Sequence, residues 1–169
     1  IEMGARSDTE PCENILVSPY ISDAFPALFS TKKIALRAVK PKRTFWGKAM
    51  LLHEENCRTG EVHRRKKHIA RHFYDLYRLI EAGIANEALA DNALFTSVIR
   101  HRAIFFRQNW MNYDTLERGG HLRLIPDDDK LPEWRSDYND MQQEMFFDEK
   151  PDFEKVIAAI RKFQNEFNR

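Results

Sequence analysis

The spacing of apolar residues changes once along this chain, near residue 43, and that change limits the folds open to it. From Lys33 to Val39 polar and apolar residues alternate, which is typical of a strand with one buried face. After Thr44 the apolar residues recur every three or four positions, which is typical of a helix with one buried face. The sequence therefore predicts an α+β chain, with a few strands first and a bundle of about five helices after them.

Residues 1–42 are predicted to be extended and interrupted by turns. Residues 1–5 and 15–21 are β-prone, and Pro19 suits the second stretch to a sheet edge or a strand end. A small isolated sheet is marginally stable unless helices cover it. We therefore expect residues 1–42 to be the last strands of a larger sheet and residues 43–169 to form a separate helical domain.

The helical part is predicted to consist of amphipathic segments with clear ends. Thr44 is a good N-cap for the first segment, and Gly83 ends the second, because glycine readily adopts the left-handed conformation that follows many helices. Pro132 and Pro151 suit the first turns of the last two segments. The expected helices cover residues 45–56, 63–82, 87–106, 132–146 and a stretch from 151 onward, and a short extended piece is expected at 122–125.

Positive charge is concentrated in the middle of the chain. Residues 31–110 contain 17 Lys/Arg and 7 Asp/Glu, an excess of ten positive charges, whereas residues 111–169 contain 9 and 14, an excess of five negative charges. A basic region of this kind attracts phosphate-bearing partners, although a solvated basic surface without a ligand is the alternative. The most basic run, H-R-R-K-K-H at residues 63–68, is a candidate for tracking an RNA backbone.

Several sequence features bear on where the protein works. No apolar run is long enough to cross a bilayer, and the opening residues lack the basic start and apolar stretch of a signal peptide. Cys12 and Cys57 form no C-x-x-C pair and no disulfide framework. We therefore expect a soluble cytoplasmic protein without membrane contact. His68 and His72 have the spacing of a zinc-binding pair, but no second ligand pair has suitable spacing, so a zinc site is not expected.

Three stretches carry the motifs that bear on function. They are I-E-M-G-A-R-S-D at residues 1–8, P-K-R-T-F-W-G-K-A-M-L-L-H at 41–53 and R-H-F-Y-D-L-Y-R-L at 71–79. In this order they resemble the AbiEii/AbiGii nucleotidyltransferase toxin family, whose members carry an E-R-T-F-W-E-K-A helix start and an R-H-Y-Y-D-L-Y-R-L helix. Lys42 and Gly47 stand where members of that family often have glutamate. The resemblance covers nearly the whole chain.

The resemblance implies a polymerase-β-type nucleotidyltransferase, which transfers a nucleotide from a nucleoside triphosphate to an RNA acceptor, such as tRNA, or to a protein. In such enzymes Mg²⁺ ions held by carboxylates align the attacking hydroxyl with the α-phosphate. Two of those carboxylates lie in a D-x-D that follows a G-S turn, and this sequence contains no such motif. The resemblance thus implies that residues 1–42 are remnant strands of a nucleotidyltransferase core and that this chain alone is inactive. It also implies a toxin–antitoxin or phage abortive-infection setting with a separately encoded antitoxin.

The family motifs single out three candidate catalytic residues. Lys48 matches the motif lysine and would neutralise charge on a triphosphate. Asp75 matches the motif aspartate and would orient Lys48 or an arginine, although a salt bridge within its own helix is the alternative. Glu2 matches the third carboxylate and is the candidate Mg²⁺ ligand. The candidates for nucleotide or phosphate binding are Arg43, Lys48, Arg71 and Arg78.

A different class of function is also compatible with the sequence. The helical part is then a non-catalytic module whose basic face binds RNA or a protein partner. The two hypotheses disagree about Lys48, because only a nucleotide site makes one lysine decisive.

Overall fold

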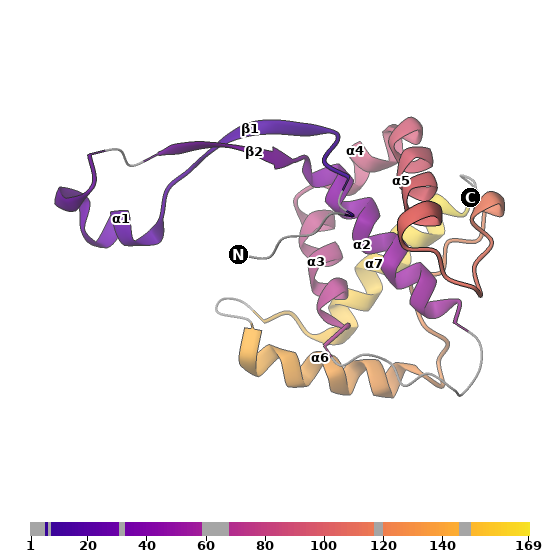
Figure 1. The fold of residues 1–169 in the computed structure, drawn as a ribbon. Helices are drawn as coiled ribbons and strands as arrows, with labels where there is room; N and C mark the ends of the chain where they lie inside the picture. Colours follow the sequence, from indigo (N-terminus) through magenta and orange to yellow (C-terminus); the bar gives the residue numbers. More distant parts are fainter. Residues whose placement is uncertain (1–5, 7, 31–32, 59–67, 117–119, 146–149) are drawn as a thin grey trace.

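A body of helices and a projecting two-stranded arm make up the fold (Figure 1). Strands β1 and β2 lie in the arm, and helices α2 to α7 form the body. The arrangement confirms the predicted α+β class, with strands first and a helical bundle after them. The predicted strand at residues 1–5 lies outside the described residues. The computed structural model describes residues 6, 8–30, 33–58, 68–116, 120–145 and 150–169.

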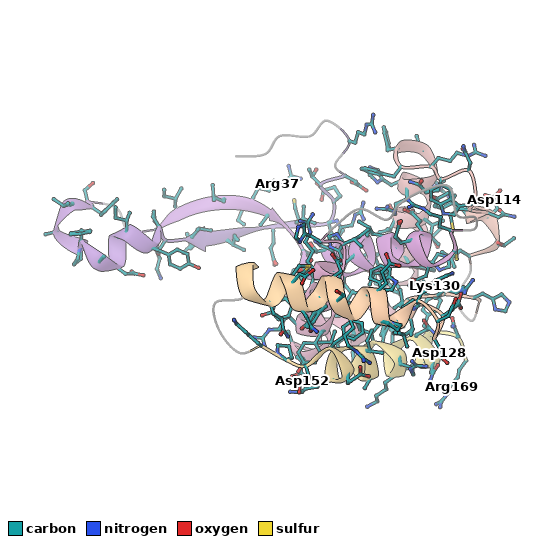
Figure 2. The ribbon with its side chains drawn as sticks, turned by 90° about the horizontal axis from the view of Figure 1, so that it is seen from below. Arg37, Asp114, Asp128, Lys130, Asp152 and Arg169 are labelled. Carbon is teal, nitrogen blue, oxygen red and sulfur yellow. The ribbon has the colours of Figure 1, made fainter. Side chains whose placement is uncertain are left out.

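The arm is an antiparallel ribbon of β1 (Cys12–Val17) and β2 (Ile34–Val39). Its register places Cys12 opposite Val39 at the end of the ribbon nearest the body. The ribbon projects away from the helices in both views, and Arg37 lies on it (Figure 1 and Figure 2). The strand predicted from the alternating pattern before the first helix is therefore confirmed.

The tip of the arm is helical, which corrects the strand expected at residues 15–21. That stretch begins in β1 but ends in α1 (Tyr20–Ala24), and the 3-10 helix η1 (Pro26–Leu28) follows. Pro19 is the N-cap of α1, and its carbonyl accepts hydrogen bonds from the backbone N–H and the hydroxyl of Ser22. The prediction was wrong because a proline at the end of a strand is equally compatible with a following helical turn.

Neither face of the arm is buried, which corrects the expectation of a half-buried strand. Ile34 and Leu36 are 52% and 50% exposed although they occupy the apolar face of the alternating pattern. Backbone hydrogen bonds of the ladder, rather than apolar burial, hold the ribbon together. The large apolar residues exposed on the arm are Ile15, Leu16, Val17, Tyr20, Ile21, Phe25, Leu28, Ile34, Leu36 and Val39.

Helix α2 (Pro41–Asn56) lies at the centre of the body and begins earlier than predicted. Its first residue is Pro41, whose missing N–H and fixed φ suit the first helical position, so Thr44 is not the N-cap. Phe45 and Trp46 are fully buried, and the Trp46 indole N–H donates to the carbonyl of Ala88 at 3.2 Å. The core therefore fixes the rotation of α2 about its own axis.

Three helices follow in place of the two predicted for this region. Gly83, with φ of 78°, separates the first two, as predicted, and Asp91 separates the last two. The Asp91 carboxylate accepts a hydrogen bond from the Leu94 N–H at 3.0 Å and pairs with Lys42 at 2.6 Å. This cap splits the single helix expected at residues 87–106. The helices are α3 (Arg71–Glu81), α4 (Ile84–Ala90) and α5 (Asn92–Phe105).

The last two helices agree with the sequence prediction. α6 (Leu131–Met145) and α7 (Phe153–Phe167) begin within two residues of the expected positions. One face of α7 is buried as expected, and it packs against α3. The short 3-10 helix η2 (Tyr113–Thr115) lies between α5 and α6.

The extended segment 122–125 pairs with side chains instead of with a strand. Gln164 of α7 accepts hydrogen bonds from the backbone N–H groups of Leu124 and Ile125, at 2.6 and 3.0 Å. His53 Nδ1 of α2 accepts one from the Arg123 N–H at 2.9 Å. Polar side chains thus satisfy a buried stretch of backbone that would otherwise lose its hydrogen bonds to water.

Candidate functional site

Lys48 of α2 and Asp75 of α3 lie in contact across the interface between their helices. Lys48 Nζ is 2.7 Å from Asp75 Oδ2, and the two side chains are 31% and 37% exposed. The structure therefore brings together the two motif residues that the sequence singled out. Among the described residues, neither Arg71 nor Arg78 pairs with Asp75, so the salt bridge expected between Asp75 and an arginine of its own helix is not formed.

His72 completes this cluster, although its spacing from His68 had suggested only a zinc-binding pair, which was not expected to be a site. Its side chain is 9% exposed, and its Nδ1 lies 3.2 Å from both Lys48 Nζ and Asp75 Oδ2. One ring nitrogen cannot serve both neighbours at once, because it accepts from an ammonium only when deprotonated and donates to a carboxylate only when protonated. The signal available in the sequence was its position three residues before Asp75, on the same face of the helix.

The surroundings of Asp75 keep its carboxylate ionised. Partial burial raises the pKa of Asp75, but hydrogen bonds from His72 and Lys48, together with the charge of Lys48, outweigh this effect and hold the pKa below its usual range. A negative Asp75 at neutral pH in turn holds the Lys48 ammonium in place. The cluster therefore presents a positioned cation at a partly open surface.

The remaining candidates occupy different surroundings. Arg43 is 7% exposed in the first turn of α2 and pairs with Asp8 at 3.3 Å, so it anchors the segment before the arm. Arg71 and Arg78 are exposed on α3, and neither forms an ion pair with another described residue. Glu2 lies outside the described residues.

A cavity of about 340 Å³ adjoins the cluster, and we call it the basic cavity. Two of its walls come from α2 and from the start of α3. On α2 the lining residues Leu51 and Glu55 come after Lys48 in the chain, whereas the lining residues His68 and His72 come before Asp75. Helices α2 and α3 therefore run in opposite directions along the cavity. The third wall comes from the segment around the end of α5. The lining residues are Leu51, Glu54, Glu55, Arg58, His68, Ile69, Arg71, His72, Arg102, Phe106, Gln108 and Trp110.

A buried network fixes the third wall of the basic cavity. Glu54 accepts hydrogen bonds from Arg102 Nε and Nη2 at 2.7 and 2.5 Å, and from the hydroxyl of Tyr113 at 3.0 Å. Burial and the Glu54 charge raise the pKa of Tyr113 to about 12. The indole N–H of Trp110 donates to the Glu54 carbonyl at 2.9 Å. These contacts hold the segment after α5 against α2.

Comparison with known protein families gives a match over most of the chain. A family model described as "Nucleotidyl transferase AbiEii toxin, Type IV TA system" matches residues 1–159. The chain belongs to the AbiEii family. AbiEii proteins are nucleotidyltransferase toxins of type IV toxin–antitoxin systems, so a cognate antitoxin is the partner that membership implies. No curated protein and no solved structure matches the chain.

The described residues of this AbiEii chain do not fit a Mg²⁺ site. Within them, no group of three or more His, Cys, Asp or Glu side chains is placed to hold a metal ion. Asp75 Oδ2 is engaged by an ammonium and an imidazole, and no second carboxylate of the described residues joins Asp75 in a group of ligands such as Mg²⁺ requires. In the same part of the chain, no helix is both long and apolar enough to span a membrane.

Proposed function

We propose that the Lys48–His72–Asp75 cluster holds the triphosphate of an incoming nucleotide in a nucleotidyl transfer reaction. The observation that carries the proposal is the 2.7 Å contact between Lys48 Nζ and Asp75 Oδ2 at a partly exposed surface. An ammonium has three donors, and Asp75 and His72 together take at most two of them. One donor of Lys48 therefore remains for a phosphate oxygen.

Each member of the cluster has a distinct part in the proposed reaction. Lys48 neutralises negative charge that builds up on the triphosphate as the nucleotide is transferred. Asp75 orients the Lys48 ammonium, and the buried His72 ring supports one of the two at a time through its Nδ1. The acceptor is an RNA, such as tRNA, or a protein. Mg²⁺ is part of the proposal for the complete active site, with Glu2 as a candidate ligand.

Calorimetric titration of the chain with each nucleoside triphosphate tests the proposal. Lys48→Ala should lower the affinity at least about tenfold, which corresponds to the loss of about 1.4 kcal/mol of binding free energy. Lys162→Ala is the matched control, because it removes an equally positive, exposed residue on α7. Unchanged triphosphate affinity in Lys48→Ala, with the fold retained, contradicts the proposal.

The basic middle of the chain supports a second candidate function, a module that binds a polyanion without catalysis. In that case Lys48→Ala and Arg100→Ala, which removes an exposed positive charge from α5 within the basic middle, should weaken RNA binding by similar, small factors. The affinity should also fall steeply with salt, because each neutralised phosphate releases counterions. A salt titration of the two variants in parallel therefore separates the two functions.

A further inference from the structure

We propose that the basic cavity binds a nucleotide and contacts both the phosphate and the base of that nucleotide. This site is separate from the Lys48 ammonium. Its volume of about 340 Å³ lies within the range of pockets that hold small molecules. His72 lines the cavity and also contacts Lys48 and Asp75, so the two sites share a wall. In the transfer reaction the nucleotide in the cavity would be the acceptor, and this role rests on the proposed function. Its binding in the cavity does not depend on that function.

Arg71 supplies the uncompensated positive charge of the cavity. Two of the three lining arginines are paired with lining glutamates: Arg58 with Glu55 at 2.8 Å, and Arg102 with Glu54. Arg71 is exposed at the start of α3 and has no ion-pair partner within the described parts of the chain. A guanidinium with free donors binds phosphate oxygens through two parallel hydrogen bonds.

Two further polar atoms of lining residues lack partners within the described part of the chain. Arg58 Nε and His68 Nδ1 are both buried, and neither has a hydrogen-bond partner among the described residues. Unpaired polar atoms of this kind are uncommon in folded proteins, because removing them from water without a partner is unfavourable. An anionic oxygen that reached Arg58 Nε would provide it with an acceptor, and it would do the same for His68 Nδ1 in the tautomer that carries a proton on that nitrogen.

The backbone at His68 is strained, and another helix holds it in place. His68 has φ of 62°, in the left-handed region that residues other than glycine rarely adopt. The Asp137 carboxylate of α6 accepts hydrogen bonds from the N–H groups of His68 and Ala70, at 2.7 and 2.9 Å. Strain that neighbouring structure maintains is concentrated at ligand sites. Asp137 therefore positions His68 at the wall of the cavity.

Aromatic rings and guanidinium planes add a surface for a base. The Arg58 guanidinium lies over the Trp110 ring at 4.8 Å, and that of Arg102 lies over Phe106 at 5.1 Å. Any of the nucleobases can stack on such planes, because each base has an aromatic face. Phosphate-binding charge and stacking planes in one cavity fit a nucleotide better than a simple anion.

Tryptophan fluorescence of the whole chain provides a local measurement. The chain has three tryptophans, of which Trp46 and Trp134 are 1% and 2% exposed, whereas Trp110 is partly exposed at the cavity. AMP should quench the emission in a saturable way, and Trp110→Phe should remove the change. Ribose 5-phosphate, which lacks the base, should bind at least about tenfold more weakly. Equal affinity for the two ligands would overturn the assignment of a base site.

Substitutions locate the ligand and separate this proposal from the previous one. Arg71→Ala should weaken AMP binding at least about tenfold, while Arg37→Ala, which removes an exposed arginine from the arm, should leave it unchanged. Lys48→Ala should keep AMP binding and lose triphosphate binding. Normal AMP binding by Arg71→Ala rules out a separate nucleotide site. Loss of both AMP and triphosphate binding in Arg71→Ala and in Lys48→Ala alike rules it out as well.

The source of the nucleotide is resolved by a second titration. A short single-stranded oligoribonucleotide contains the same phosphate and base as AMP. Tighter binding of the oligonucleotide, lost in Arg71→Ala, supports the end of an RNA strand as the ligand. Tighter binding of AMP, lost in the same variant, supports a free nucleotide.

Discussion

The ammonium of Lys48 and the carboxylate of Asp75 lie 2.7 Å apart although they belong to different helices and different sequence motifs. Their contact depends on the packing of α2 against α3. The buried residues Phe45 and Trp46 hold α2 within the core, and Leu76 does the same for α3, next to Asp75 in the chain. The geometry of the cluster is therefore set by apolar burial, whereas the charges only complete it.

Removal of the Asp75 charge should affect binding more than stability. Asp75→Asn keeps the shape of the side chain but no longer holds the Lys48 ammonium. Because the pair is about one-third exposed, the free energy of unfolding should fall by less than about 1 kcal/mol. Triphosphate affinity should fall several-fold. Urea unfolding and calorimetry measure the two effects, and Asp140→Asn, on the exposed face of α6, is the control.

The sequence predicted the helices better than their junctions. Pro132 lies in the first turn of α6, and Pro151 lies just before the N-cap of α7 rather than in its first turn; with the clear apolar periodicity, both helix starts were found within two residues. The break at Asp91 was missed because the apolar spacing continues through it. An aspartate three residues before Leu94, whose N–H it binds, was the signal available.

The candidate site was only partly predictable. Lys48 and Asp75 were found through their family motifs, but which residue pairs with Asp75 depends on how α2 and α3 pack. His72 was considered only for its spacing from His68, because its contact with Lys48 depends on the same packing. The arm shows the complementary limit: alternation of polar and apolar residues indicates a strand at Ile34–Val39, but it does not say whether anything covers the apolar face.

The buried ion pair behind the basic cavity should be important for stability. Glu54→Ala leaves Arg102 and the Tyr113 hydroxyl without their shared acceptor. Breaking a buried pair from one side costs about 3 kcal/mol or more, because a charge remains in the protein interior without its partner. Urea unfolding should show this loss. Glu87→Ala, at an exposed position of α4, should change the free energy of unfolding by less than about 0.5 kcal/mol.

Acid should destabilise the protein through His53. Burial and the charge of Arg123 lower the pKa of His53 from 6.5 to about 4, and the Arg123 N–H donates to its Nδ1, which requires the neutral ring. The unfolded chain therefore binds a proton that the folded chain does not, between about pH 6.5 and pH 4. The His53 contribution to the free energy of unfolding should fall by about 3 kcal/mol as pH drops through this window, and be constant below it.

The variant His53→Asn isolates that contribution. Its amide oxygen can accept the Arg123 N–H without titrating. Cys57 Sγ lies 3.8 Å from the ring nitrogens, and burial raises the pKa of this thiol, so it remains neutral throughout the window. Unfolding measured from pH 4 to pH 7 should be less pH-dependent in the variant. An identical pH profile in both proteins would contradict the assignment to His53.

Apolar residues of the arm should contribute little to the stability of the folded chain. Leu16 and Leu28 are 66% and 78% exposed, so Leu16→Ser and Leu28→Ser remove side chains that folding leaves in water. Each change should alter the free energy of unfolding by less than about 0.5 kcal/mol. Leu76→Ala is the matched core variant, because Leu76 is fully buried, and it should cost about 2–5 kcal/mol. A comparable loss in the two arm variants would mean that the arm packs against apolar surface in solution.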